Sequence, residues 1–167
     1  MERSDLLLTT AQIGMALAGF AGLVTLLGRP SPKADARLNA IRFRSMVELS
    51  LALAAFSLLP FLPAELGASE AGAWRVSSAL YAVIAFSFVT HSVIRNRRDL
   101  GRVLIFGGVT AALIALCLGV GFALALNAAG AFAAPAGVYF ASLFTNFLGA
   151  AFFFIRLLYA ALPAPEP

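Results

Sequence analysis

The stretch VLIFGGVTAALIALCLGVGFALALNAAGAFAAPAGVYFASLFTNFLGAAFFFI, residues 103–155, decides the fold because it contains no charged residue. A helix needs about 20 apolar residues to cross a bilayer, so this stretch is too long for one crossing. Its middle, from Asn127 to Gly137, combines Asn, Gly and Pro and is typical of a turn. The stretch therefore predicts two transmembrane helices, residues 103–126 and 138–162, joined by a short loop.

The composition of the whole chain indicates the same class of protein. Of its 167 residues, 61% are hydrophobic and 12% are charged, whereas soluble domains carry about 45–50% and about 25%. A chain this short cannot bury so much apolar surface in one water-soluble core, so the surplus is expected to face lipid. The apolar runs are continuous and do not alternate, which favours helices over a β-barrel. We expect an all-α, polytopic transmembrane helical bundle.

Three further apolar runs precede this stretch and complete a set of five predicted spans. They cover residues 6–28, 45–63 and 76–94. The chain, residues 1–167, is thus predicted to be a single transmembrane domain without a soluble domain. A signal peptide is the alternative for the first run. Its flank is not net positive, however, and the run exceeds the usual length of about 7–15 residues.

The basic residues are unevenly distributed among the predicted loops. The first and third loops are rich in Arg, whereas the second loop carries only Arg75 and the fourth carries none. Short loops rich in Lys and Arg stay in the cytoplasm, which places the N-terminus outside and the C-terminus inside. Abundant Ala and Arg, with Lys33 as the single lysine, suggest a bacterial cytoplasmic membrane. Trp74, Tyr81 and Tyr159 at span ends suit interfacial aromatic belts.

Several classes of function are disfavoured by what the sequence contains. The net charge of +4 comes from short loops beside apolar runs, so it favours anionic lipid and not nucleic acid. The single cysteine, Cys117, rules out an intrachain disulfide and a multi-cysteine metal site. The chain has no zinc-protease, P-loop, nucleophile-elbow or dinucleotide motif. We expect no enzyme activity, no metal and no cofactor.

Three ionisable residues lie within the predicted spans, where a charge is costly, so each is a candidate functional residue. Glu48, His91 and Arg156 all fall near the cytoplasmic ends of their spans. As an intramembrane polar cluster, Glu48 would bind a proton or cation, His91 would titrate and Arg156 would supply a counter-charge. The alternative is structural: Glu48 pairs with Arg44 four residues earlier, and His91 hydrogen-bonds to a neighbour.

Gln12 and Asn146 form a second candidate polar pair, in the outer halves of the first and fifth spans. Their side-chain amides could hydrogen-bond across helices, which contributes about 1 kcal/mol or less. They could also line a pore. The sequence leaves both interpretations open.

Small residues at every fourth position predict close helix packing. The fourth span carries the longest such series, a candidate helix-packing ridge of Gly107, Ala111, Ala115, Gly119 and Ala123. Shorter series occur in the first span (Gly14, Ala18 and Gly22) and the fifth (Ala141, Thr145 and Gly149). The ridge could hold one subunit together or join subunits of a homo-oligomer.

Two functional hypotheses follow from these features. The first is an oligomeric channel or transporter-like subunit that uses the cytoplasmic-side polar cluster. The second is a non-transporting scaffold, sensor or accessory subunit of a larger complex of membrane proteins. An odd number of spans without an internal repeat disfavours a self-contained carrier.

Overall fold

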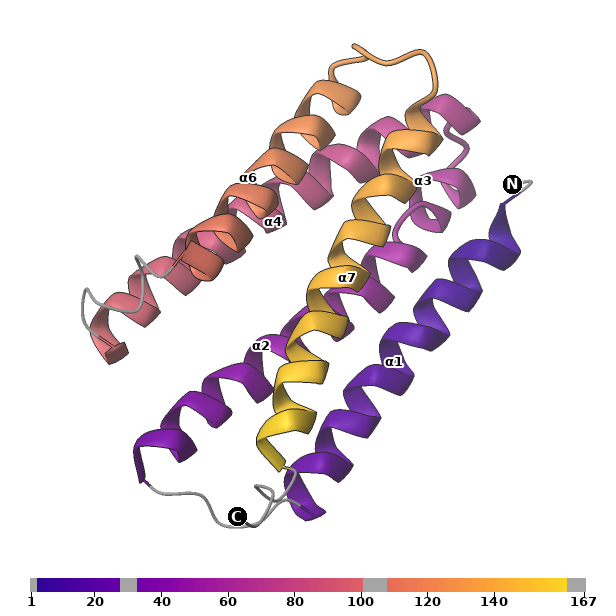
Figure 1. The fold of residues 1–167 in the computed structure, drawn as a ribbon. Coiled ribbons are helices and arrows are strands. Elements are labelled where there is room, and N and C mark those ends of the chain that lie inside the picture. Colours follow the sequence, from indigo (N-terminus) through magenta and orange to yellow (C-terminus); the bar gives the residue numbers. More distant parts are fainter. Residues whose placement is uncertain (1–2, 28–32, 101–107, 162–167) are drawn as a thin grey trace. The chain divides into compact units, whose positions relative to one another are not determined.

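The structure is a computed structural model that describes residues 3–27, 33–100 and 108–161 (Figure 1). All regular secondary structure in these ranges is helical, which confirms the all-α prediction. The helices are α1 (Ser4–Leu27), α2 (Lys33–Leu58), α3 (Phe61–Glu65), α4 (Glu70–Leu100), α6 (Gly108–Ala128) and α7 (Pro135–Ala161).

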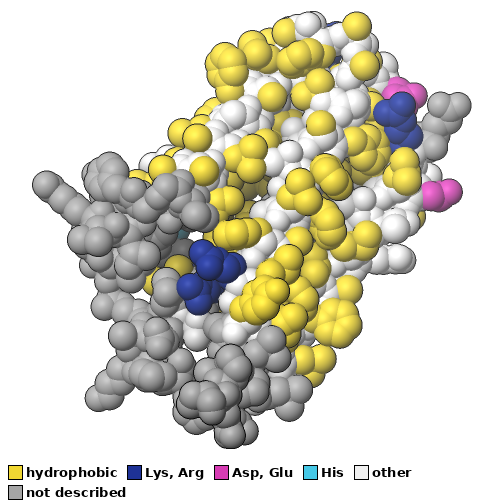
Figure 2. Space-filling model, in the orientation of Figure 1, with side chains coloured by type: hydrophobic (Ala, Val, Ile, Leu, Met, Phe, Trp, Pro, Cys, Tyr) yellow, Lys and Arg dark blue, Asp and Glu magenta, His cyan; other side chains and the backbone are white. Residues whose placement is uncertain are grey.

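Five segments of these helices are long and apolar enough to cross a membrane, which confirms the predicted number. They are Ser4–Val24, Asn39–Glu65, Glu70–His91, Ala111–Ala128 and Pro135–Tyr159. Hydrophobic side chains cover much of the molecular surface in Figure 2, as expected where lipid replaces water as the solvent. These features indicate a membrane location, while insertion itself and the direction of each crossing stay predictions.

The chain divides into two compact units, with the boundary inside α7. The first unit contains α1, α2 and the part of α7 from Leu143 onward. The second unit contains α3, α4, α6 and the part of α7 up to Ser142.

In the first unit, α1 packs along α2 through residues spaced three and four apart. The buried positions are Leu7, Ala11, Gly14 and Ala21 on α1, and Met46, Ser50, Leu53, Ala54, Phe56 and Ser57 on α2. A Cβ atom added to Gly14 would lie 2.7 Å from the Ser50 carbonyl oxygen and 3.0 Å from the Ala54 nitrogen. The predicted small-residue contact is therefore present at Gly14, whereas a Cβ on Gly22 would meet nothing within 4 Å.

The C-terminal part of α7 completes the core of the first unit. Buried Ala21, Met46 and Leu157 bring the three helices together, and partly buried side chains pack around them, among them Phe43, Val47, Phe153 and Phe154. Further along, a Cβ added to Gly149 would lie 3.5 Å from Leu49 Cδ1. Because the α7 numbers rise as the α2 numbers fall, α2 and α7 run antiparallel.

In the second unit, α4 packs against α6, also antiparallel. Asn127 near the end of α6 meets Ser78 near the start of α4, and Gly121 meets the ring of Phe86. A Cβ on Gly121 would lie 3.0 Å from Phe86 Cζ, so this glycine makes room for the ring.

The helix ends in the second unit follow turn residues in the sequence. Gly67 after α3 and Gly130 after α6 have φ values of 86° and 84°, which favour glycine. Backbone hydrogen bonds from Gly130 to Asn127 and from Ala131 to Leu126 close a Schellman turn. The side chain of Ser69 accepts a hydrogen bond from the Gly72 nitrogen at 3.2 Å and caps the start of α4.

Candidate functional site

Glu48 lies on α2 and forms an ion pair with Arg44, one helical turn earlier. The Arg44 Nε donates to Glu48 Oε1 at 2.7 Å, and the two side chains are 57% and 27% exposed. This is the local pair that the sequence offered as the structural explanation for Glu48. Such a pair stabilises a helix by about 0.2–0.5 kcal/mol when exposed. It also places a compensating positive charge beside the carboxylate.

Arg156 and His91, the other members of the candidate polar cluster, are both exposed. The Arg156 guanidinium carbon lies 5.6 Å from the centre of the Phe152 ring, one turn earlier on α7. Glu48 and Arg156 belong to the first unit and His91 to the second. The joint action of the three residues stays a prediction.

Gln12 and Asn146, the candidate outer pair, both belong to the first unit. Gln12 is exposed on α1, and Asn146 is half-buried on α7. The Asn146 Oδ1 is buried and accepts no hydrogen bond from the described residues. The structure records no hydrogen bond between the two amides, so it does not give them the role of a paired interhelical contact.

The small-residue ridge of α6 is exposed within the second unit. Ala111, Ala115 and Gly119 are exposed, Ala123 is half-buried, and Gly107 lies outside the described residues. A Cβ added to Gly119 would meet nothing within 4 Å. Instead, α6 contacts Phe86 of α4 through Gly121, two residues away and on nearly the opposite side of the helix.

The second unit contains a buried aromatic cluster that the sequence did not reveal. The Trp74 and Tyr139 rings lie 5.5 Å apart, and the Tyr81 and Tyr139 rings 5.8 Å apart. Trp74 is 1% exposed and Tyr81 is 3% exposed, so their assignment to an interfacial aromatic belt was wrong. They pack inside the unit because α7 brings Tyr139 against the start of α4. Tyr159, at 71% exposure, remains compatible with a belt.

Asn127 is fully buried beside this cluster and ties three elements together. Its Nδ2 donates to Ser78 Oγ on α4 and to the Pro135 carbonyl at the start of α7, both at 2.9 Å. The sequence identified Asn127 only as a turn residue. The informative signal was its place inside the apolar run, with a serine pair, Ser77 and Ser78, near the facing end of the preceding long helix.

The turn after α6 also contacts an arginine side chain, that of Arg75 on α4. A Cβ added to Gly130 would lie 3.3 Å from Arg75 Cζ, so the guanidinium lies against the C-terminal end of α6. A cation is favourable at this end of a helix, where the backbone carbonyls carry negative partial charge. Arg75 therefore has a structural role in the second unit.

No grouping of three or more His, Cys, Asp and Glu side chains suited to a metal ion occurs within the described ranges. Searches against protein-family models, curated proteins and solved structures found no match to this chain.

Proposed function

We propose that this chain is a subunit of an oligomeric assembly in a membrane and that it associates through the small-residue ridge of α6. The observation that carries this proposal is the exposure of Ala111, Ala115 and Gly119, with open space beside Gly119. In lipid, helices associate by close packing of small residues, since burying apolar surface gains little. A second helix could approach the α6 backbone here more closely than at any of the bulky flanking residues.

The local charge arrangement favours a non-transporting scaffold or accessory role for this assembly. A proton or cation site requires a carboxylate whose charge is open to the ligand. Glu48 is instead held by Arg44 at 2.7 Å. We place the assembly in a bacterial cytoplasmic membrane, with the N-terminus outside and the C-terminus in the cytoplasm, on the basis of the basic first and third loops.

Disulfide cross-linking tests the proposed contact. In a Cys117→Ala background, Gly119→Cys supplies one cysteine per chain, so any disulfide must join two chains. Leu118→Cys is the matched control, because Leu118 is also exposed but points about 100° away around the helix. We expect oxidised membranes to give a covalent dimer with Gly119→Cys and far less with Leu118→Cys. Equal yields, or no dimer from Gly119→Cys, would contradict the proposed contact.

The second candidate function is an oligomeric channel or transporter-like subunit. It is favoured by Gln12, an exposed amide on an apolar helix, and by the unpartnered carbonyl oxygen of Asn146. In this version Glu48, His91 and Arg156 would control the pathway on the cytoplasmic side. Ion or proton flux into proteoliposomes tests it. Flux that falls in Gln12→Leu and loses its pH dependence in a Glu48→Gln, His91→Ala double variant would support a pore, whereas unchanged flux would remove it.

A further inference from the structure

Two buried side chains of the second unit each have a polar atom without a hydrogen-bond partner among the described residues. The atoms are the indole nitrogen of Trp74, a donor, and the amide oxygen of Asn127, an acceptor. Trp74 is 1% exposed and Asn127 is fully buried, so bulk solvent reaches neither atom. Burial of a polar atom without a hydrogen bond is costly, and a bound water is a common explanation for such atoms in folded proteins.

Neither atom can gain a partner through a simple rotation of its side chain. The buried Ser77 hydroxyl also has no partner in the described ranges, but a serine hydroxyl can turn to its own helix backbone, as Ser57 does at 2.7 Å. The Trp74 nitrogen is part of a rigid ring. The Asn127 amide cannot be reversed, because its nitrogen donates to the Pro135 carbonyl, which can only accept.

A closed set of contacts places the indole and the amide in the same part of the second unit. Trp74 and Ser78 lie one turn apart on α4, and the Ser78 hydroxyl oxygen lies 2.9 Å from Asn127 Nδ2. Pro135 and Tyr139 lie one turn apart on α7. Asn127 donates to the Pro135 carbonyl at 2.9 Å, and the Tyr139 ring lies 5.5 Å from the Trp74 ring. The contacts thus lead from Trp74 through three helices back to Trp74.

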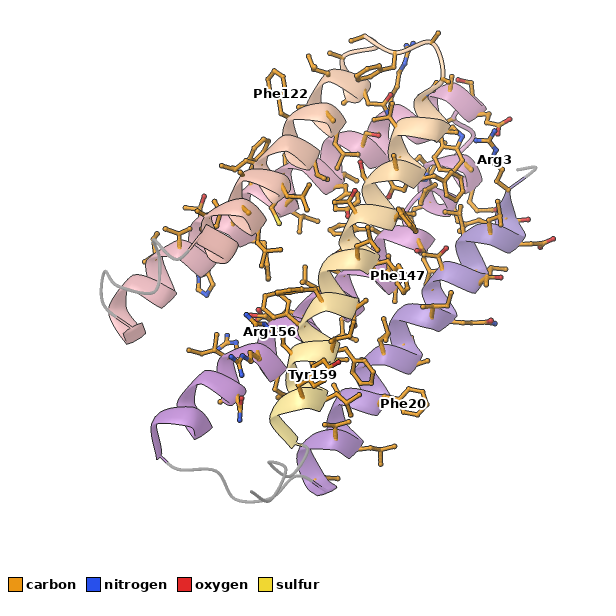
Figure 3. The ribbon with its side chains drawn as sticks, viewed as in Figure 1. Arg3, Phe20, Phe122, Phe147, Arg156 and Tyr159 are labelled. Atoms are coloured by element: carbon orange, nitrogen blue, oxygen red, sulfur yellow. The ribbon has the colours of Figure 1, made fainter. Side chains whose placement is uncertain are left out.

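The interior of this set of contacts is closed to lipid. Phe122 is labelled in Figure 3, where it points outward from α6, and it is 62% exposed. Asn127 follows it by five residues, lies about 140° further around the helix, and is fully buried. The ring of Phe140 also packs against Trp74, at 5.7 Å. Because both polar side chains are covered almost completely, only a very small polar molecule suits the site.

We propose that one internal water molecule bridges Trp74 Nε1 and Asn127 Oδ1. The water oxygen accepts a hydrogen bond from the indole N–H, and one water hydrogen is donated to the amide oxygen. Buried waters make about two to four hydrogen bonds, and these two atoms supply two of them. The water joins the start of α4 to the end of α6. This site lies inside the second unit and does not depend on the assembly proposed for α6.

Nuclear magnetic resonance of the full chain in detergent micelles tests this site. Trp74 is the single tryptophan, so isotope labelling of tryptophan gives one indole N–H signal. A water held beside this proton gives Overhauser cross-peaks of opposite sign in the laboratory and rotating frames, whereas proton exchange gives the same sign in both. We expect opposite signs in the wild type. Cross-peaks of the same sign, or none, would overturn the proposal.

Three variants separate a bound water from nearby hydroxyl groups. Asn127→Leu keeps a similar side-chain volume but removes the acceptor, so we expect both cross-peaks to be lost. Asn127→Asp keeps an oxygen at this position and should retain them. Ser77→Ala is the matched control, because it removes a buried hydroxyl one turn from Trp74, and it should also retain them.

Two results from the variants would contradict the water site. They are cross-peaks that persist in Asn127→Leu and cross-peaks that disappear in Ser77→Ala, which would assign the signal to the serine hydroxyl. Far-UV circular dichroism and a single symmetric gel-filtration peak confirm that each variant is folded. If Asn127→Leu fails that check, Ser78→Ala takes its place as a second hydroxyl control. The wild-type cross-peaks should then persist in both serine variants, and their loss in either one would contradict the site.

Discussion

Among the described glycines, Gly14 makes the closest contact between α1 and α2. Its hydrogen faces the Ser50 carbonyl and the Ala54 nitrogen, where a methyl group would overlap both. Contact at the backbone gains van der Waals packing, a main source of helix association in lipid, and weak Cα–H···O contacts add to it. A single methyl group at this position would separate the two helices.

We therefore predict that Gly14→Ala destabilises the protein by about 1–3 kcal/mol, the usual cost of an overpacked contact. The measurement is the free energy of unfolding in mixed micelles of detergent and dodecyl sulfate, followed by circular dichroism. Gly22→Ala is the control on the same helix, because its Cβ would meet nothing within 4 Å. Equal stability of the two variants would show that α1 and α2 do not pack as described.

Asn127 provides a second test at the residue scale. Asn127→Ala leaves Ser78 and the Pro135 carbonyl without the donor that each now has at 2.9 Å. We expect a loss of about 1–3 kcal/mol in the same unfolding assay, as for other buried hydrogen-bonding groups. A double-mutant cycle with Ser78→Ala should give a coupling energy of about 0.6 kcal/mol. Strict additivity would mean that the Asn127–Ser78 hydrogen bond is absent.

The contacts of individual residues could be predicted from the sequence where the partner lies nearby in the chain. The spacing of Arg44 and Glu48 by four on a helix was enough to suggest their ion pair, which the structure contains. The burial of Trp74 could not be foreseen in this way. Its partner Tyr139 is far away in the sequence, and an aromatic residue at the end of a span is equally compatible with lipid and with a neighbouring helix.

At the scale of helices and turns, the connection between α6 and α7 has the largest number of residues that fix its backbone conformation. Gly130 supplies the positive φ that a Schellman turn needs, and the Arg75 guanidinium fills the space where a side chain would begin. The turn also exposes the Pro135 carbonyl to Asn127. Asn127, Gly130 and Pro135, the residues that predicted this turn, therefore each make a different contribution to it.

Gly130→Ala should reduce stability by about 1–2 kcal/mol, because alanine pays a steric cost at positive φ. The approach of Arg75 at 3.3 Å to the new Cβ should add to this loss. Thermal unfolding in detergent measures the effect. Gly137→Ala at the start of α7 is the matched control, since its Cβ has no neighbour within 4 Å. A Gly130→Ala variant as stable as Gly137→Ala would contradict the turn geometry.

Apolar runs predicted the number of long helices well but not where all of them begin and end. The second span was predicted at 45–63, whereas α2 begins at Lys33 and its apolar segment continues through a turn into α3. The helix α4 continues to Leu100, beyond the predicted limit of 94. Hydropathy marks the part of a helix suited to lipid, and polar helical turns beyond it carry no such signal.

At the scale of the whole molecule, the predicted orientation can be tested through its loops. In a Cys117→Ala background, Ala68→Cys labels the second loop, where residue 68 is exposed, and Ser31→Cys labels the first. We expect a membrane-impermeant maleimide to modify Ala68→Cys in intact cells and Ser31→Cys only after permeabilisation. The reverse pattern would invert the orientation, and labelling of both in intact cells would contradict a crossing between them.

The sequence could not reveal which helices pair, because nearly every span offers apolar and small residues on several sides. Of the small-residue series, Gly14 and Gly149 contact neighbouring helices in the first unit. The longest series, on α6, is exposed in the second unit. The series that looked most suited to packing is thus available for association, and this contrast is the basis of the proposed assembly.

The mass of the protein in lipid nanodiscs tests the proposed assembly most directly. We expect the wild type to contain more than one chain per disc, by native mass spectrometry or mass photometry with the lipid mass subtracted. Gly119→Leu should reduce this to one chain, whereas Leu118→Ala, on the flanking side of α6, should leave it unchanged. A wild type that contains a single chain across a wide range of protein-to-lipid ratios would contradict the account.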